Sequence, residues 1–599
     1  MKLIDMKHVA MLCLTVVALS ARAETREVGT VAELVTAVTE LTHSYDEIVL
    51  TAESYALTAT LSPANVKIRG RSDNPRETVV YGDGTFRVVS FAKTGGTLAN
   101  LTVSNGYATA ASSVSAAGVL GVSMKTRPLL TNVVVTCCTL AADGSKYGYG
   151  AAVGSAELRN CIVCGNRATG SNVYGGGVFD CVAYDTEIRD NNVLSYGGGA
   201  YKSSLYRCTV AGNVAGESGG GLYDANAYEG TVISNNVAAA AGGGCFGSGA
   251  AEWNVLSDSE VCFNRIESSS SSTTCLGAGV AKLAAVSHCV IRGNAITDAA
   301  AKNRLGAGAY GSVLADCIVR DNFLAEGSAA ALYQCTASWT LCSNNCAGAS
   351  AGGALQETTA TDCTFYGAAV EYAGSFFNCK FLNLTTVDAF VFPAGANVVA
   401  TGSYDGPKCM VSVKTGGQVF AATNCLFAGN HVSTYLFEKS KTDAFEMVNC
   451  TIVDNVTKDR TFTGSGIEAD AKPVVLINCA FPRNYNEGGN RMDFRTDSTG
   501  CNFVLTNCLF GAYKTEDKDY VTPEFGSVNN VADMKFDTSS SAHPYSLSRK
   551  SPAIDSGLVM DWMSGATDLM GNARRHDTGV AIGCYECWLP PPGLILLFR

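Results

Sequence analysis

Short runs of alternating apolar and polar residues recur along the chain, separated by turns rich in glycine and asparagine. Cys208-Thr-Val-Ala211 and Cys289-Val-Ile-Arg292 are two such runs. In an extended backbone, successive side chains of such a run point to opposite faces, whereas an amphipathic helix repeats its apolar residues every three or four positions. The pattern therefore predicts many short β-strands and excludes helical arrays such as ankyrin, TPR and HEAT repeats.

One repeated motif consists of an apolar residue, two variable residues and an asparagine. Its asparagines from Asn166 to Asn322 are 22 to 30 residues apart, which is the length of one short coil. The copies are Val163–Asn166, Ile188–Asn191, Val210–Asn213, Ile233–Asn236, Val261–Asn264, Ile291–Asn294, Val319–Asn322, Phe427–Asn430, Ile452–Asn455 and Phe481–Asn484. Stacked units of this kind bury a core that no single unit can bury alone, so the pattern predicts a solenoid of coils with three short strands each.

A second motif has three glycines, an apolar residue and an aromatic residue. It reads Gly175–Phe179, Gly197–Tyr201, Gly219–Tyr223 and Gly242–Phe246. We expect the glycines at a tight corner with no room for side chains. We also expect the asparagine of the first motif to adopt a left-handed backbone and to hydrogen-bond its counterparts in neighbouring coils.

The 25 cysteines raise the question of disulfides. We expect most of them at one inward repeat position, and seven, including Cys161 and Cys208, lie two positions before the apolar residue of the first motif, where both residues should point inward. At such a position cysteine acts as a small buried hydrophobe, so we predict a ladder of mainly free thiols, with disulfides as the alternative. Cys161-x-x-Cys164 and Cys584-x-x-Cys587 lack a second ligand pair for zinc, and no metal site is predicted.

Residues 1–23 have a lysine-bearing start, an apolar stretch from Val9 to Leu19 and the site Ala21-Arg-Ala23. This pattern is typical of a secretory signal peptide, so we expect an exported protein, either secreted or on the cell surface or outer membrane. No later stretch reaches the roughly 18 apolar residues that a membrane-spanning helix needs. A net charge of −11, with only 16% charged residues, argues against binding to nucleic acid.

These repeats resemble those of the polymorphic outer-membrane proteins at Phe427–Asn430, Phe481–Asn484 and Gly352–Leu355, although we expect no autotransporter barrel of the kind that follows the repeats in that family. More broadly, the chain is similar to right-handed parallel β-helices of the pectate-lyase-like class. The resemblance implies an all-β, right-handed parallel β-helix solenoid with an N-terminal capping helix that starts at Val31. The end of the chain, with Ser551–Asp555 and Ile582–Glu586, looks like that of many exported bacterial β-helix proteins.

The predicted organisation has five parts. Residues 1–23 form the signal peptide, 24–45 the N-terminal cap, 46–545 the β-helix, 546–586 a C-terminal end region and 587–599 a short apolar tail. The β-helix would contain about twenty coils, or roughly 90–100 Å at about 4.8 Å per coil.

Two sets of outward residues are candidates for binding. Arg292 and Arg320 occupy the same position in adjacent coils, where two guanidinium groups could bind a uronate or sulfate between them. The alternative is that acids such as Asp321 pair with them in solvent. Tyr201, Tyr223 and Phe246 form an aromatic file that could bind sugar faces or, alternatively, only stabilise itself by stacking.

The sequence favours a surface-associated, adhesin-like or glycan-binding rod, whose partner is an extended polysaccharide or cell-surface glycan. The alternative is a polysaccharide lyase or glycoside hydrolase, because this fold hosts such enzymes but does not by itself establish an activity. No catalytic residue is identified, and no cofactor is implied except calcium under the lyase alternative. We expect a monomer.

Overall fold

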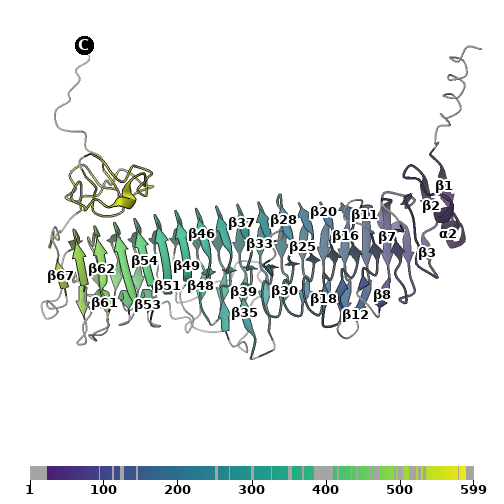
Figure 1. The fold of residues 1–599 in the computed structure, drawn as a ribbon, viewed down its shortest axis with the longest axis horizontal. Helices are drawn as coiled ribbons and strands as arrows, with labels where there is room; N and C mark the ends of the chain where they lie inside the picture. The colour runs from purple at the N-terminus through teal and green to yellow at the C-terminus, as the bar shows by residue number, and fades with distance from the viewer. Residues whose placement is uncertain are drawn as a thin grey trace, which may run out of the picture.

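The computed structural model shows a long solenoid with a small folded segment beside one end (Figure 1). The predicted signal peptide and apolar tail lie outside the described residues, except for Ala23 and Cys587. The structure describes residues 23–587 except for 93–94, 111–113, 122–126, 143–145, 250–253, 269, 271, 298–302, 326, 348–353, 367–369, 384–408, 414–416, 418, 433–434, 440–442, 458–459, 465–471, 492–493, 497–502, 511–520, 524–527, 530–533 and 578.

Parallel strands from successive coils pair along the whole solenoid and form what we call the first column. Its strands are β1 (Thr25–Val28), β2 (Glu47–Leu50), β4 (Lys67–Arg69), β7 (Thr97–Ser104), β11 (Leu129–Thr136), β15 (Glu157–Arg159), β20 (Val182–Tyr184), β24 (Ser204–Tyr206), β28 (Asn226–Tyr228), β32 (Val255–Ser257), β37 (Ala285–Ser287), β42 (Val313–Ala315), β46 (Thr336–Ser338), β49 (Leu355–Thr361), β51 (Val370–Phe377), β54 (Val419–Thr423), β58 (Ala444–Val448), β62 (Val474–Ile477), β65 (Phe503–Thr506) and β67 (Val521–Pro523). Each pairing is parallel and joins equivalent strands of adjacent coils. The predicted all-β parallel solenoid is confirmed, while its right-handedness stays a prediction.

The second column continues each coil after a sharp corner. It contains β16 (Ile162–Cys164), β21 (Glu187–Arg189), β25 (Thr209–Ala211), β29 (Val232–Ser234), β33 (Glu260–Cys262), β38 (Val290–Arg292), β43 (Ile318–Arg320), β47 (Leu341–Ser343), β50 (Thr364–Tyr366), β52 (Lys380–Leu382), β55 (Leu426–Ala428) and β59 (Thr451–Val453). The third column contains β8 (Tyr107–Ala110), β12 (Thr139–Ala142), β17 (Arg167–Thr169), β22 (Asn192–Val193), β26 (Val214–Ala215), β30 (Val237–Ala238), β34 (Arg265–Ile266), β39 (Ala295–Ile296), β44 (Phe323–Leu324) and β48 (Cys346–Ala347).

The fourth column follows the glycine triads. Its strands are β6 (Val89–Ser90), β10 (Val119–Leu120), β14 (Val153–Gly154), β19 (Val178–Phe179), β23 (Ala200–Tyr201), β27 (Leu222–Tyr223), β31 (Cys245–Phe246), β36 (Val280–Ala281), β41 (Ala309–Tyr310) and β45 (Leu332–Tyr333). A middle coil thus has four short strands, and the expectation of three was wrong. The reason is that residues with left-handed backbone, such as Asp180 and Asp185, divide one extended side into separate strands.

The N-terminal end carries α2 (Val31–Glu40), where the sequence predicts a capping helix. Thr30 and Glu33 form a capping box, and Leu34, Ala37 and Val38 are buried in the main core. Strand β1 pairs with β2, so the sheet begins at Thr25, ahead of the predicted start at residue 46.

The interior is a continuous stack of apolar side chains. Cys161 and Val163, Cys208 and Val210, and Cys289 and Ile291 are all at most 2% exposed, as the inward pattern predicts. Burial raises the pKa of the Cys208 thiol to about 11, so this group stays protonated at neutral pH.

Buried asparagines form a ladder at the corner between the second and third columns. In each step, the Nδ2 group of one asparagine donates to Oδ1 of the asparagine in the next coil at 2.8–3.0 Å. The same Oδ1 also accepts the backbone N–H of the first asparagine. The ladder consists of Asn166, Asn191, Asn213, Asn236, Asn264, Asn294, Asn322 and Asn345, with a second stretch of Asn430, Asn455 and Asn484. The predicted pairing is confirmed.

The expectation of a left-handed backbone at these asparagines was wrong. Positive φ occurs at the residue before each one, for example at Asp190 (55°) and Gly212 (66°). The chain turns at that preceding residue, which leaves the asparagine side chain directed into the core, where it reaches its neighbours.

The glycine triads occupy a corner with no space for a Cβ atom, as predicted. A Cβ at Gly198 would lie 2.2 Å from the carbonyl oxygen of Gly220, and one at Gly199 would lie 2.7 Å from that of Gly221. The first glycine of the triad, Gly197, has a φ of 69°. Backbone from adjacent coils therefore approaches within hydrogen-bonding distance at this corner.

The segment from Met534 to Cys587 folds against the side of the last coils (Figure 1). Outward residues of the solenoid and apolar residues of this segment form one buried cluster. Its members include Leu426, Ala428, Val453, Ala480 and Leu509 from the coils, and Met534, Leu547, Ala553, Leu569, Ile582 and Tyr585 from the segment.

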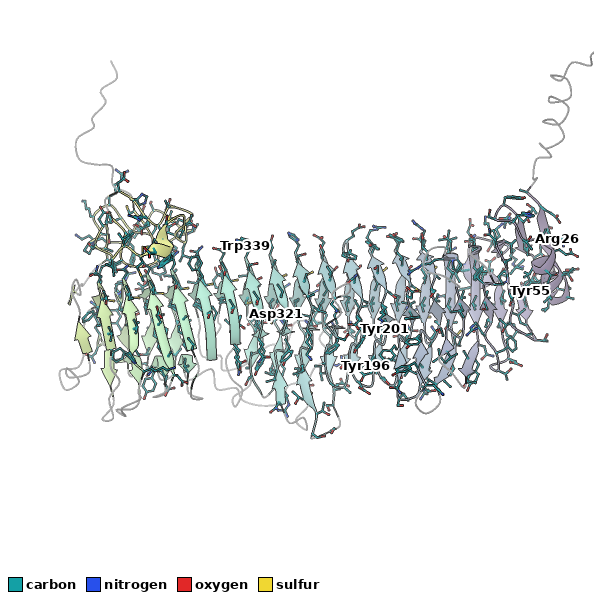
Figure 2. The ribbon with its side chains drawn as sticks, viewed as in Figure 1. Arg26, Tyr55, Tyr196, Tyr201, Asp321 and Trp339 are labelled. Carbon is teal, nitrogen blue, oxygen red and sulfur yellow. The ribbon has the colours of Figure 1, made fainter. Side chains whose placement is uncertain are left out.

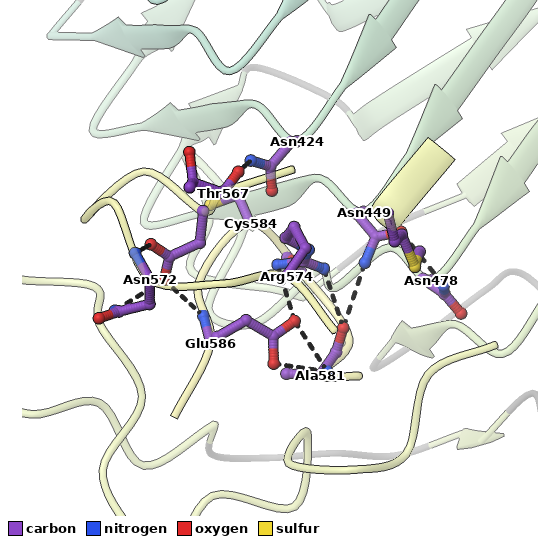
Figure 3. Close-up of polar contacts among 12 residues, drawn as sticks. Asn424, Asn449, Asn478, Thr567, Asn572, Arg574, Ala581, Cys584 and Glu586 are labelled. Atoms are coloured by element: carbon purple, nitrogen blue, oxygen red, sulfur yellow. Dashed lines mark hydrogen bonds and ion pairs between the residues drawn. The ribbon is translucent and has the colours of Figure 1, made fainter. Parts of the chain in front are cut away.

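Corner asparagines of the last coils also hold the C-terminal segment (Figure 3). Asn449 Nδ2 donates to the carbonyl of Ala581 at 3.2 Å. Asn478 exchanges two 2.7 Å hydrogen bonds with the peptide group of Leu558. Since an asparagine side chain matches the donor and acceptor of one peptide unit, these contacts fix the segment in a defined register on the coils.

Removing one amide of the asparagine ladder should strongly destabilise the solenoid. In Asn191→Ala, the N–H and Nδ2 groups of Asn166 both lose the acceptor Asn191 Oδ1, and Asn213 Oδ1 and the Val163 carbonyl both lose the donor Asn191 Nδ2. We expect the free energy of unfolding in urea to fall by at least about 3 kcal/mol, since each orphaned buried polar group costs roughly 1–3 kcal/mol. The neighbouring Asn192→Ala, at an exposed side chain, should change it by less than about 0.5 kcal/mol. Equal effects of the two substitutions would contradict the role of the ladder.

The inward cysteines should be reduced and unreactive in the native protein. Among the described residues, Cys137 is exposed whereas Cys208, Cys289, Cys450 and Cys479 are buried, and all of these are free thiols. Iodoacetamide should therefore label Cys137 in the folded protein and the buried thiols only after unfolding, as read by mass spectrometry without reduction. A majority of disulfide-linked cysteines between residues 208 and 508 would contradict this prediction.

Candidate functional site

The glycine corner brings together aromatic residues from its two sides. The residue before each triad and the last residue after it flank the corner, as Tyr196 and Tyr201 do (Figure 2). In the preceding coil these positions hold Tyr174 and Phe179. Together with their neighbours in adjacent coils they form one continuous group, which we call the aromatic panel. The panel consists of Tyr147, Tyr149, Tyr174, Phe179, Tyr196, Tyr201, Tyr223 and Phe246.

Rings from the two sides of the corner are in direct contact. The ring centroids of Tyr149 and Phe179 are 4.8 Å apart, those of Tyr174 and Tyr201 are 4.8 Å apart, and Tyr196 and Tyr223 are separated by 4.9 Å. Outward side chains on two strands converge only where the chain between the strands bends inward. The panel therefore lines a re-entrant corner of the solenoid.

Along the solenoid axis the rings follow the coils. Phe179 and Tyr201 are stacked at 5.6 Å with planes 19° apart, and Tyr223 and Phe246 at 5.3 Å with planes 21° apart. Between Tyr201 and Tyr223 the planes turn by 54°. This turn divides the file into two stacked pairs, which contact each other at an inclined angle.

Burial raises the pKa of five panel tyrosines, so their hydroxyl groups stay protonated at neutral pH: Tyr149, Tyr174, Tyr196, Tyr201 and Tyr223. Burial raises the pKa of Tyr201, which is only 8% exposed, to about 12. The pKa of Tyr196 is raised by burial and by a hydrogen bond with Glu217. Tyr147, at the edge of the panel, is 46% exposed. The panel thus combines half-buried apolar rings with neutral hydroxyl groups, which can donate and accept hydrogen bonds.

A column of polar residues with left-handed backbone borders the panel directly after the fourth-column strands, and we call it the rim. Its charged members are Asp180, Lys202, Asp224 and Lys282. The Lys202 ammonium lies 5.2 Å from the ring centre of Tyr201, and that of Lys282 lies 5.6 Å from the ring centre of Phe246. Both lysines therefore make cation–π contacts with the panel.

The arginines predicted as an anion site are register neighbours, on β38 and β43. However, Arg292 Nε contacts Glu260 Oε1 at 2.5 Å, and its guanidinium lies 4.8 Å from the ring centre of Phe263. Arg320 pairs with Asp321 at 2.5 Å. Each arginine thus has its own carboxylate, and the two lie on the second column, away from the fourth-column residues Tyr201, Tyr223 and Phe246.

Sequence reasoning found one side of the panel and missed the other. The facing tyrosines Tyr149, Tyr174 and Tyr196 come directly before the glycine that opens each corner. The available signal was therefore the pair Tyr-Gly, which two further glycines follow at Tyr174 and Tyr196. Another missed group, on the first column, is a stack of Tyr184, Tyr206 and Tyr228 with centroid distances of 4.9 and 5.0 Å.

The C-terminal segment contains a cavity of about 540 Å³ with mixed lining, including Asp537, Arg549, His576 and Glu586. Beneath it, the wholly buried Arg574 pairs with Glu586 at 3.1 Å (Figure 3). Burial raises the pKa of Glu586 to about 7, although the charge of Arg574 acts in the opposite direction. This pair supports the fold of the segment, because its carboxylate accepts the N–H of Ala581.

Within the described part of the chain, no group of three or more His, Cys, Asp or Glu side chains is placed to bind a metal ion. A search of the same residues for helices that are long and apolar enough to cross a membrane finds none.

Comparison with known proteins gives similarities to solved structures only. No protein-family model matches the sequence, and a search of curated proteins gives no match. Pectate lyase Pel9A is 8% identical with a TM-score of 0.22, over 95% of this chain and 97% of that chain. The N-terminal fragment of bacteriophage Phi29 gene product 12 is 11% identical with a TM-score of 0.29, over 87% and 94%. The PL6 family alginate lyase AlyGC is 9% identical with a TM-score of 0.20, over 85% and 99%. At these values, no activity of the matched proteins transfers to this chain.

Proposed function

We propose that this protein is an exported, surface-associated rod that binds an extended glycan along the aromatic panel. The observation that carries the proposal is the convergence of eight aromatic rings from consecutive coils on one re-entrant corner. Aromatic residues with a polar tip are well suited to a ligand that is partly apolar and partly hydrated. A sugar ring has this character, because its axial C–H groups form apolar faces and its hydroxyl groups lie around the edge.

The shape of the panel fits a chain ligand better than a small molecule. Small molecules bind in enclosed pockets that bury most of their surface. The panel is instead an elongated strip that continues from Tyr147 to Phe246 along successive coils. Its half-buried rings form a contiguous apolar surface, which on a soluble protein marks an interaction site.

The proposal retains Tyr201, Tyr223 and Phe246 as binding residues and leaves out Arg292 and Arg320. A free guanidinium pair would attract an anionic sugar, but these two guanidiniums already contact Glu260 and Asp321. Displacing those carboxylates would cost what the new contact gains.

Loss of two panel rings should weaken glycan binding. We expect Tyr196→Ala combined with Tyr223→Ala to raise the dissociation constant at least tenfold, which corresponds to about 1.4 kcal/mol. Affinity electrophoresis in soluble β-glucan, arabinoxylan, polygalacturonate and alginate would measure the effect.

The matched control is Tyr206→Ala with Tyr228→Ala, which removes a stacked tyrosine pair from the same coils but outside the panel. This control should lose similar stability and keep full binding, as should Arg292→Ala with Arg320→Ala. The proposal is wrong if none of the polysaccharides retards the protein, or if the control and the panel variant lose binding equally. Release of unsaturated or reducing ends that depends on the panel would favour the lyase or hydrolase alternative.

A further inference from the structure

The charges around the panel balance one another. The carboxylate of Asp180, which is mostly buried, accepts hydrogen bonds from Arg127 Nη2 at 2.6 Å and from the Ser155 hydroxyl at 2.8 Å. Asp224 is 4% exposed and accepts the backbone N–H and the hydroxyl of Ser248 at 2.7 and 2.5 Å. Both rim carboxylates therefore have their hydrogen-bonding capacity directed at the protein.

The rim lysines do not provide a free cationic strip. Lys202 and Lys282 lie over the rings of Tyr201 and Phe246. The two coils that carry Asp224 and Gly247 lie between Lys202 and Lys282, so the two rim lysines are not in adjacent coils. On the opposite side of the corner, the exposed Glu217 lies in the coil after that of Tyr196 and hydrogen-bonds Tyr196. A polyanionic ligand would meet alternating charges here, on a chain whose net charge is −11.

The rings on each side of the corner form a file that runs along the solenoid axis. Within a file, one ring follows the next at 5.1 Å from Tyr174 to Tyr196 and at 5.8 Å from Tyr201 to Tyr223. Across the corner the rings touch, so the two files form one continuous strip of rings parallel to the solenoid axis. An extended pyranose chain advances by about one coil spacing per residue, so successive sugars can lie over successive coils.

Building on the proposed function, we infer that the panel binds an uncharged glycan chain that lies parallel to the solenoid axis. The rings supply the apolar contact, and the tyrosine hydroxyl groups supply hydrogen bonds to sugar hydroxyl groups. The lysines stabilise the ring surface and are not anion-binding groups.

The test compares neutral and acidic polysaccharides that share a backbone. Hydroxyethyl cellulose is paired with carboxymethyl cellulose, and arabinoxylan with glucuronoxylan. We expect at least one neutral member to bind at least tenfold more tightly than its acidic counterpart. We also expect its affinity to change less than twofold between 50 and 500 mM NaCl, since no counterions are released. Tighter binding of the acidic member, with affinity that falls as salt rises, would overturn the inference.

A second variant addresses the lysines directly. Lys202→Met with Lys282→Met keeps the methylene chains over the rings and removes both charges, so neutral-glycan affinity should stay within about threefold of the wild-type value. A loss of more than tenfold would overturn the assignment of the lysines.

Failure of the inference and failure of the proposed function give different results. Panel-dependent binding of an acidic polysaccharide leaves the binding function intact and refutes only the preference for an uncharged chain. Absence of all polysaccharide binding, or binding that Tyr196→Ala with Tyr223→Ala leaves unchanged, refutes both.

Discussion

The asparagine ladder is the interaction on which the regular stacking of coils depends. Most strands contain only two or three residues, too few to specify their own register, and a slip of one residue would turn every side chain to the wrong face. Each ladder amide accepts two hydrogen bonds from the coil before it and donates to the coil after it, as Asn264 does between Asn236 and Asn294. A coil out of register would leave these buried groups unpaired, at roughly 1–3 kcal/mol each. The ladder therefore keeps register although coil length varies from 22 residues between Asn191 and Asn213 to 30 residues between Asn264 and Asn294.

With register fixed, every outward position becomes a column, and the glycine corner decides what the columns can do. Because adjacent backbones are in contact at Gly198 and Gly199, no side chain separates the strands on either side. The aromatic residues that flank the triads must therefore converge, as Tyr196 and Tyr223 do. The panel is thus a consequence of two constraints, the hydrogen-bonded register and the missing side chains at the corner. A change at either should disturb the panel without touching a ring.

The sequence predicted those features that repeat every coil. Inward cysteine and valine positions, paired asparagines and the crowded glycines could be inferred because each appears many times with the same chemistry. Features that depend on a single neighbour could not. The pairing of Arg292 with Glu260 requires knowing which residues of adjacent coils lie side by side, and 32 positions separate these two in the chain. The contact between Asn449 and Ala581 spans 132 positions and belongs to a segment without repeats.

Comparison of two stretches of one column shows why side-chain chemistry, and not position, distinguishes the surface on which we propose glycan binding. The second column carries Arg292 and Arg320 in its middle coils and Ala428 and Val453 in its last coils. The arginines are charged and partly exposed, whereas the alanine and valine are buried by the C-terminal segment. The C-terminal segment of the same chain thus covers this apolar stretch of the solenoid surface. The aromatic panel is comparably apolar, yet within the described residues its rings contact one another, the rim lysines and Glu217, and Tyr147 stays 46% exposed. An apolar surface that the chain does not cover with its own residues is the one on which an external ligand gains most from burial.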